Sequence, residues 1–320
     1  VAPSVAEVGA GDVIHVLDSD YRIDRVEEAG ARRLQGVRVE SGVYAPRNRE
    51  VPVKTRALPA SFGPVYAEFL DLPLLEGSEV EHAFHLAASG DPWPGRVAVY
   101  SASADYGYRL NTTLARSAVV GELASPLVKG KAGLWQRSGV RVKVASGYLA
   151  SMPEADVLNG ANRAAIRSVG GDWEVFQFCN AELVADREYL LTKLLRGQAG
   201  TEFLIPNEWA VGTDFVLLNG AVGQVDLAAA ERGLDRHYRI GAAHSPYDDA
   251  SYVHQVFAGQ GVGLRPYAPA HLRALVDGDV AFSWVRRTRI EGDVWQSYEV
   301  PLGEEREAYL VRVTQSGTVL

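Results

Sequence analysis

The chain has 320 residues, of which 47% are hydrophobic and 22% are charged, and its net charge is -8. These values are typical of a folded protein of two or three domains and exclude a largely disordered chain. The acidic balance argues against a nucleic-acid-binding surface, which is usually basic. One cysteine, Cys179, excludes an internal disulfide and a multi-cysteine zinc site, and its aromatic neighbours predict that it is buried.

Short strand-like runs, separated by Gly, Pro, Asp and Asn, begin near the N-terminus. Residues 13–17, 21–26 and 33–39 are three such runs at close intervals, and EEAG at 27–30 supplies a turn between the last two. This spacing predicts an antiparallel meander. The sequence of residues 44–54 is typical of an exposed linker.

The middle of the chain continues this pattern. Residues 95–103 and 106–114 predict a hairpin, and residues 139–149 alternate valine with charged residues, as in a half-buried strand. Residues 172–184 predict a pair of strands. Residues 188–197 form either a strand or a short helix.

Two segments carry helical signals. Pro153, followed by acidic residues in the first turn, begins a predicted helix over 153–166, which LNGAN at 158–162 interrupts. Residues 226–243 begin like a helix and continue as a strand. No run of 18 apolar residues predicts a membrane span, and no signal peptide is expected.

A boundary is expected near Pro266 and Pro269, where the chain becomes extended. Two strands joined by an Asp-Gly turn follow, the second with Trp284, as at the opening of a fibronectin type III-like sandwich. We therefore predict a mainly β protein of several small sandwich-like or barrel-like domains with few short helices, the last domain being incomplete. The expected domains are the end of a tail-hub β-domain (1–50), a β-rich hub domain (51–150), a β-rich domain with short helices (151–265) and the start of a fibronectin type III-like domain (266–320).

The stretch YLLTKLLRGQAGTE resembles a glycine-rich phosphate loop at first sight. It lacks the lysine of a P-loop and the third glycine of a dinucleotide loop, and a proline opposes the helix that should follow. We interpret Gly197 and Gly200 as residues of a tight structural turn with positive φ. Arg196 should hold this turn by binding Glu202 or Glu182.

Other candidate sites are weaker. His82 and His85 are three residues apart, which on a strand directs them to opposite faces, so no metal site and no cofactor are predicted. No G-x-S-x-G nucleophile motif is present. The arginines of SWVRRTR at 283–289 predict a solvated strand face with cross-strand ion pairs. No catalytic residues are predicted.

Five segments together resemble a known family. Residues 21–44, 68–75, 91–100, 189–202 and 282–313 are similar to the C-terminal half of the large tail-tip protein of alphaproteobacterial gene transfer agents and related long-tailed phages. The resemblance implies a longer protein with an N-terminal glycoside-hydrolase-like TIM barrel, a tail-hub region and C-terminal β-domains. Because the chain lacks an initial Met and stops in a strand-like run, we expect it to be a piece of such a protein.

The resemblance implies a virion component of the tail tip or baseplate, assembled in the bacterial cytoplasm. It would form a homotrimer on the tail axis, close the tube, contact other hub proteins and the host surface, and aid DNA delivery without specific nucleic-acid contact. The apolar runs at 67–77 and 201–211 are expected to be intersubunit surfaces. The alternative is a carbohydrate- or receptor-binding module with Trp93, Trp209 and Trp295 stacking on sugars, and a glycan hydrolase is a third hypothesis.

Overall fold

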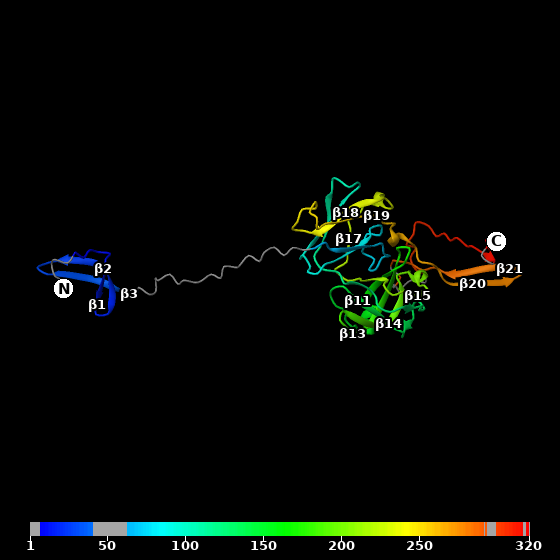
Figure 1. The fold of residues 1–320 in the computed structure, drawn as a ribbon, viewed down its shortest axis with the longest axis horizontal. Coiled ribbons are helices and arrows are strands. Elements are labelled where there is room, and N and C mark those ends of the chain that lie inside the picture. Colours follow the sequence, from blue (N-terminus) through cyan, green and yellow to red (C-terminus); the bar gives the residue numbers. More distant parts are fainter. Residues whose placement is uncertain (1–6, 41–62, 291, 293–298, 316–317, 320) are drawn as a thin grey trace. The chain divides into compact units, whose positions relative to one another are not determined.

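The computed structural model describes residues 7–40, 63–290, 292, 299–315 and 318–319. The chain divides into two units, Val1–Ala60 and Ser61–Leu320. The described part is mainly β with one short α-helix, which confirms the predicted fold class (Figure 1).

The first unit is a three-stranded antiparallel meander. Its strands are β1 (Val13–Val16), β2 (Ser19–Glu28) and β3 (Arg32–Val39), in the order β1-β2-β3. The three predicted strands are confirmed, and the turn between β2 and β3 lies at Ala29–Ala31. Ile23 in the middle strand is buried. The linker predicted over 44–54 lies outside the described residues.

Two antiparallel sheets that share one core form a sandwich, one of the two main parts of the second unit. Their strand orders are β17-β5-β4 and β19-β18-β6-β7. The strands are β4 (Tyr66–Leu70), β5 (His85–Ser89), β6 (Val97–Ala102), β7 (Arg109–Leu114), β17 (Gly223–Gln224), β18 (Arg236–Ala242) and β19 (Val253–Phe257). The predicted hairpin of 95–103 and 106–114 is the β6–β7 pair.

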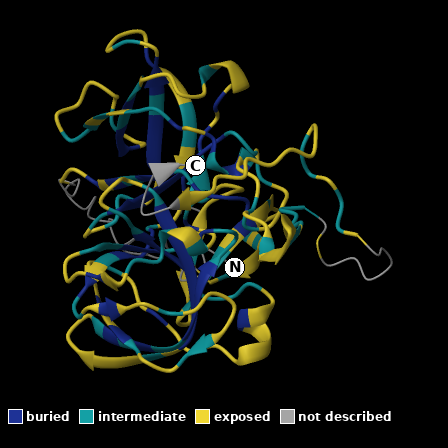
Figure 2. Cartoon of the chain, turned by 90° about the vertical axis from the view of Figure 1, so that its right-hand side faces the viewer, coloured by how far each residue is buried: buried dark blue, intermediate teal, exposed yellow. Residues whose placement is uncertain are grey.

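An aromatic cluster fills the centre of this sandwich. The rings of Phe69 and Phe84 from one sheet meet those of Tyr238 and Phe257 from the other, with centroids 4.7 to 5.9 Å apart. Edge-to-face and offset aromatic pairs stabilise a core beyond the area that they bury. The two sheets are therefore held together by these aromatic side chains. Figure 2 shows where the buried residues lie along the chain.

A closed six-stranded antiparallel barrel forms the other main part of the second unit. The ring runs β14-β11-β8-β16-β12-β13 and closes where β13 pairs with β14. The strands are β8 (Val120–Leu123), β11 (Val140–Val144), β12 (Arg163–Arg167), β13 (Trp173–Ala185), β14 (Glu188–Gln198) and β16 (Asp214–Leu217), with the short β10 (Trp135–Gln136) added to β14. Because the ring closes, each of these six strands pairs with a neighbour on both sides.

The barrel interior is filled by side chains. Alternation in β11 buries Val140, Val142 and Val144, and β13 contributes Phe176 and Phe178. A short ribbon of β9 (Leu127–Val128) and β15 (Glu208–Trp209) adds Leu127 and Trp209 to the same core. The barrel is therefore a packed core, as is usual for small barrels.

The barrel is an insertion in the sandwich. All its strands follow β7 and precede β17 in the chain. Its outer face packs on the sandwich through a third buried cluster, in which Leu70, Leu72 and Ala87 meet Ala165 and Val175. The division expected at residue 150 falls between β11 and β12, two strands of this one barrel. Hydrogen-bonded pairing between distant segments places β11 and β12 in one barrel. The local composition of the sequence does not reveal such pairing.

Several predicted elements differ in length or type. The helix is limited to α1 (Glu154–Leu158), since the glycine turn after it leads directly into β12. The helical start of 226–243 is only the 3-10 turn Ala229–Glu231, and the strand pair of 172–184 is the single long strand β13. In the part of the chain that the structure describes, no helix is long and apolar enough to cross a membrane.

The two strands predicted after Pro269 are β20 (Ala270–Asp277) and β21 (Asp279–Val285), joined at Gly278, which has positive φ. Large apolar side chains on this hairpin are exposed: Leu272, Leu275, Val276, Val280, Phe282 and Val285. A further short hairpin pairs β22 (Thr314–Gln315) with β23 (Thr318–Val319). The fibronectin type III-like assignment stays a prediction.

The packed barrel core predicts a large cost for a cavity at Phe176, whose side chain is fully buried. We expect Phe176→Ala to lower the free energy of unfolding by about 3–5 kcal/mol, measured by guanidinium denaturation. The control is Leu183→Ala on the same strand, where the side chain is 61% exposed and the change should stay within about 0.5 kcal/mol. Equal effects of the two substitutions would contradict a side-chain-filled barrel.

Candidate functional site

The glycine-rich stretch forms the end of β14 and a turn into the 3-10 helix Glu202–Leu204. Gly197 and Gly200 have φ values of 61° and 80°, a region that disfavours side chains. Thr201 is buried, and its hydroxyl accepts a hydrogen bond from the Val175 N–H at 3.0 Å. The turn is thereby fixed onto the neighbouring strand β13.

Arg196 forms a two-pronged ion pair with Glu174, and both side chains have no exposure to solvent. The Arg196 Nε and Nη2 atoms each donate to one carboxylate oxygen at 2.6 Å. The predicted partner, Glu202 or Glu182, was therefore wrong. Glu174 lies 22 residues earlier on β13, and cross-strand pairing brings it to Arg196, which sequence spacing could not indicate.

The other polar atoms of this pair are also satisfied. Trp209 Nε1 donates to Glu174 Oε2 at 2.6 Å, and the Gly197 N–H donates to Oε1 at 3.2 Å. Arg196 Nη1 donates to the Val128 carbonyl at 3.1 Å. Since Val128 and Trp209 belong to the β9–β15 ribbon, the ion pair joins this ribbon to the barrel. A buried charge pair is tolerated when such additional hydrogen bonds complete it.

The same turn contacts the segment that leads to the C-terminal hairpin. A Cβ atom on Gly200 would lie 2.4 Å from the ring of Tyr267, so only glycine permits this approach. The guanidinium of Arg287 stacks on the same Tyr267 ring, 5.1 Å from its centroid, and also pairs with Glu202. The turn is therefore a packing site between chain segments.

The remaining arginines of the RRTR run are also paired. Arg286 Nη1 lies 2.9 Å from Glu307, and Arg289, with a side chain only 5% exposed, binds Glu304 at 3.1 Å and Glu81 at 3.2 Å. The expected solvated strand face is wrong, because β21 ends before this run and the Arg289 side chain is buried, whereas ion pairs of these arginines with carboxylates are present. The Arg289–Glu81 pair connects the C-terminal segment to the sandwich, whereas the pairs with Glu304 and Glu307 lie within that segment.

The tryptophans named as candidate sugar contacts have different surroundings. Trp209 is 6% exposed and lies in the barrel core, so its ring is not available for stacking on a ligand. Trp93 is half-buried and packs against the sandwich core. Trp295 lies outside the described residues.

Of the two apolar runs expected at subunit interfaces, the first is mostly covered by the chain itself, whereas most of the second is exposed or half-buried. Phe69, Leu70 and Leu72 of the first run are buried in the two cores. In the second run Phe203 is 57% exposed, with the Arg265 guanidinium 5.6 Å from its ring centroid. The first run is therefore corrected to an internal packing segment.

A charged cleft of about 640 Å³ lies between sandwich and barrel. Its lining includes four carboxylates, Asp91, Glu122, Asp186 and Asp214, and two basic residues, Lys143 and Arg187. Beside it, Tyr66 donates to Glu68 at 2.9 Å, and burial raises the pKa of the Glu68 carboxyl although the hydrogen bond and Arg167 oppose this. The cleft therefore brings acidic and basic side chains of the sandwich and the barrel together.

A second cavity, of about 410 Å³, contains His85 and Glu79 among its lining residues. His85 is 8% exposed and its Nδ1 has no hydrogen-bond partner among the described residues. Burial lowers the pKa of His85, although Glu79 acts in the opposite direction. His82 instead bonds to the Leu227 carbonyl at 2.8 Å, so the two histidines do not form a shared site.

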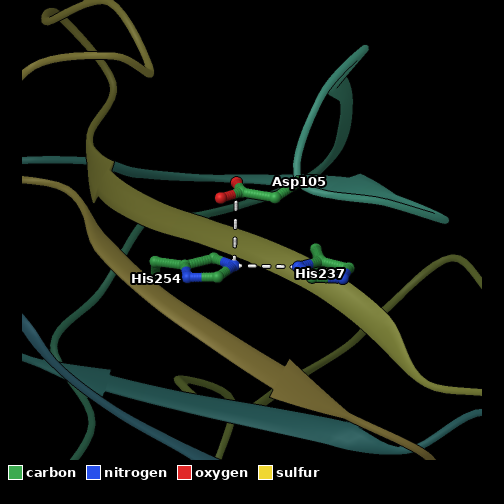
Figure 3. A group of neighbouring side chains, drawn as sticks. All are labelled: Asp105, His237 and His254. Carbon is green, nitrogen blue, oxygen red and sulfur yellow. Dashed lines mark hydrogen bonds and ion pairs between the residues drawn. The ribbon is translucent and has the colours of Figure 1, made fainter.

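Asp105, His237 and His254 lie close together at the sheet β19-β18-β6-β7 (Figure 3). No sequence pattern indicated that these three residues are neighbours. His237 Nδ1 and His254 Nε2 are 3.0 Å apart, and His254 Nε2 is 3.8 Å from Asp105 Oδ1. Hydrogen bonds from Tyr108 and from Arg239 lower the pKa of Asp105. Asp105 precedes the others by more than 130 residues, so only strand pairing reveals the group.

Residues 118–216 match the family described as Rcc01698-like, C-terminal. This match covers about a third of the chain and coincides with the barrel, from the residues before β8 to β16. It is consistent with a C-terminal domain related to gene transfer agents and phage tails. No curated protein matches the chain.

The buried ion pair predicts that removal of one charge costs more stability than removal of both. Glu174→Gln should lower the free energy of unfolding by roughly 3–5 kcal/mol, because Arg196 is left buried without a counter-charge. Replacing both residues by methionine should recover part of this loss. Guanidinium denaturation of the three proteins measures both effects.

The control for this prediction is Asp91→Asn. Asp91 pairs with Arg187 at 3.4 Å, and the two side chains are 68% and 51% exposed. We expect a change below about 1 kcal/mol. A cost of Glu174→Gln as small as that of the control would show that the pair does not hold the barrel together.

Burial of His85 predicts a pH dependence of stability. Because its pKa in the folded chain lies below the ordinary value of 6.5, the unfolded chain binds more protons as the pH falls below 6.5. Stability is therefore complete above pH 6.5 and decreases as the pH falls toward the folded pKa. We expect His85→Gln to lose less stability than wild type over this range, with both measured relative to pH 7.5. Equal losses would contradict a buried, uncharged His85.

Proposed function

We propose that this chain is a structural component of the tail tip or baseplate of a phage-like particle, where it forms a homotrimer on the tail axis. The observation that carries the proposal is the family match over 118–216, which coincides with a closed, packed barrel. In this role the chain closes the tube, contacts other hub proteins and contributes to host attachment and DNA delivery.

The internal bonding of the second unit supports a mechanical role. The barrel is held by the buried Arg196–Glu174 pair. The C-terminal segment is held by the pairs of Arg287 with Glu202 and of Arg289 with Glu81. Stiff β-domains with few helices suit a part that must keep its shape while a particle engages a cell. No step of this role requires a reaction at the charged cleft.

The exposed apolar side chains of the β20–β21 hairpin support an assembly. Val276 is 73% exposed, and Phe282 on the paired strand is 40% exposed. A contiguous apolar surface is more often an interaction site than a free surface. We propose this hairpin, in place of the buried run at 67–77, as an intersubunit surface.

Two other functions have less support. A carbohydrate-binding module would stack exposed aromatic rings on sugars, and Trp209, one of the three tryptophans expected to do so, is buried. A glycan hydrolase would need two carboxylates at opposite sides of a substrate, about 5 to 9 Å apart. The charged cleft is lined by four carboxylates, so an assay of the wild-type chain on peptidoglycan and neutral glycans separates this alternative from a structural role.

The proposal predicts where the chain is found. In particles released from cells that express it with an epitope tag, immunogold electron microscopy should place label at one end of the tail. Val276→Asp with Phe282→Asp should reduce labelling at least several-fold, because charges at a buried subunit contact are costly.

The control is Leu158→Asp, which changes a side chain that is 66% exposed at the end of α1. It should label particles as wild type does. Label distributed along the tail or on the head, or absent from intact particles, would rule out a tail-tip component. Unchanged labelling of the double variant would rule out the hairpin surface alone.

A further inference from the structure

We propose that Asp105, His237 and His254 form a binding site for a divalent transition metal of the zinc class. The group joins three chain segments: the loop between β6 and β7, strand β18 and strand β19. One ligand atom of each residue lies within 4.8 Å of the others. This site is independent of the proposed function, since it rests on side-chain geometry alone.

The two imidazoles are placed by strand register. In the antiparallel β18–β19 pair, Arg239 lies opposite His254 and His237 lies opposite Val256. His237 and His254 are therefore diagonal neighbours on one face, where cross-strand side chains can meet. Their rings are parallel to within 10°, with centroids 5.3 Å apart. Figure 3 shows the two rings side by side with Asp105 above them.

The distances are close to those of a coordination sphere. Zinc bonds of 2.0–2.2 Å to nitrogen and oxygen in a tetrahedron place ligand atoms about 3.3 Å apart. The nitrogen pair is 3.0 Å apart, and Asp105 Oδ1 is 3.8 Å from His254 Nε2. An ion bound by both imidazoles would take the place of the hydrogen atom between the two nitrogens. Water would complete the sphere, because Asp105 and His254 are exposed.

Neighbouring side chains already orient the carboxylate. Tyr108 donates to Asp105 Oδ1 at 2.6 Å, and Arg239 Nη2 donates to the same oxygen at 3.0 Å. These contacts hold the carboxylate in place and occupy Oδ1, so an ion would bind through Oδ2 or replace one of the two donors. The Arg239 charge opposes a cation, so the ligand set favours metals with strong imidazole bonds, Zn²⁺, Co²⁺, Ni²⁺ or Cu²⁺, over Mg²⁺ or Ca²⁺.

Metal binding would connect the β6–β7 loop to the β18–β19 pair. The test uses the whole chain, with Zn²⁺ titrated in a calorimeter at pH 7.5 and Co²⁺ followed by visible absorption. We expect one ion per chain and a higher melting temperature with Zn²⁺, since an ion that binds only the folded state stabilises it. His237→Ala, His254→Ala and Asp105→Asn should each weaken binding at least tenfold, and Mg²⁺ should not compete.

The matched control is His15→Ala. His15 is an exposed histidine bonded to one carboxylate, Asp20, at 2.7 Å in the first unit. This control should leave the ion count and the affinity unchanged, and circular dichroism should show that all variants remain folded. No Zn²⁺ bound at 100-fold excess, or equal losses in the control and the three variants, would overturn the proposal.

Discussion

The barrel depends on one electrostatic contact taken out of water, the pair of Arg196 and Glu174. Neither side chain is exposed, and removal of both charges from water is costly unless their hydrogen-bonding capacity is filled. Trp209, Val128 and the Gly197 backbone fill it. The pair therefore specifies one arrangement of the β9–β15 ribbon, the glycine turn and the end of the barrel, because any other arrangement would leave a buried charge without a partner.

The turn that follows Arg196 also contacts the C-terminal segment of the second unit. The turn that begins at Gly197 carries Gly200, which admits the ring of Tyr267, and Glu202, which binds Arg287. Thus one short stretch links the barrel interior to the C-terminal segment. Its glycines are required for backbone geometry and close packing, and this accounts for their spacing without a phosphate ligand.

Local patterns predicted much of the secondary structure. Alternating valines at 140–144 and the meander of the first unit could be predicted because strand periodicity is a local signal. The partner of Arg196, the insertion of the barrel and the group around His254 could not, because each depends on pairing between segments far apart in sequence. The burial of Trp209 was missed for the same reason: a two-residue strand places it over the barrel core.

The insertion of the barrel between β7 and β17 has a mechanical consequence. The chain enters the barrel from one sheet of the sandwich and returns to the other, so two covalent connections and a buried apolar cluster join the two bodies. A domain on a single linker can swivel, whereas two crossings restrict rotation about either one. The barrel therefore has less rotational freedom against the sandwich than a terminal domain on one linker would have.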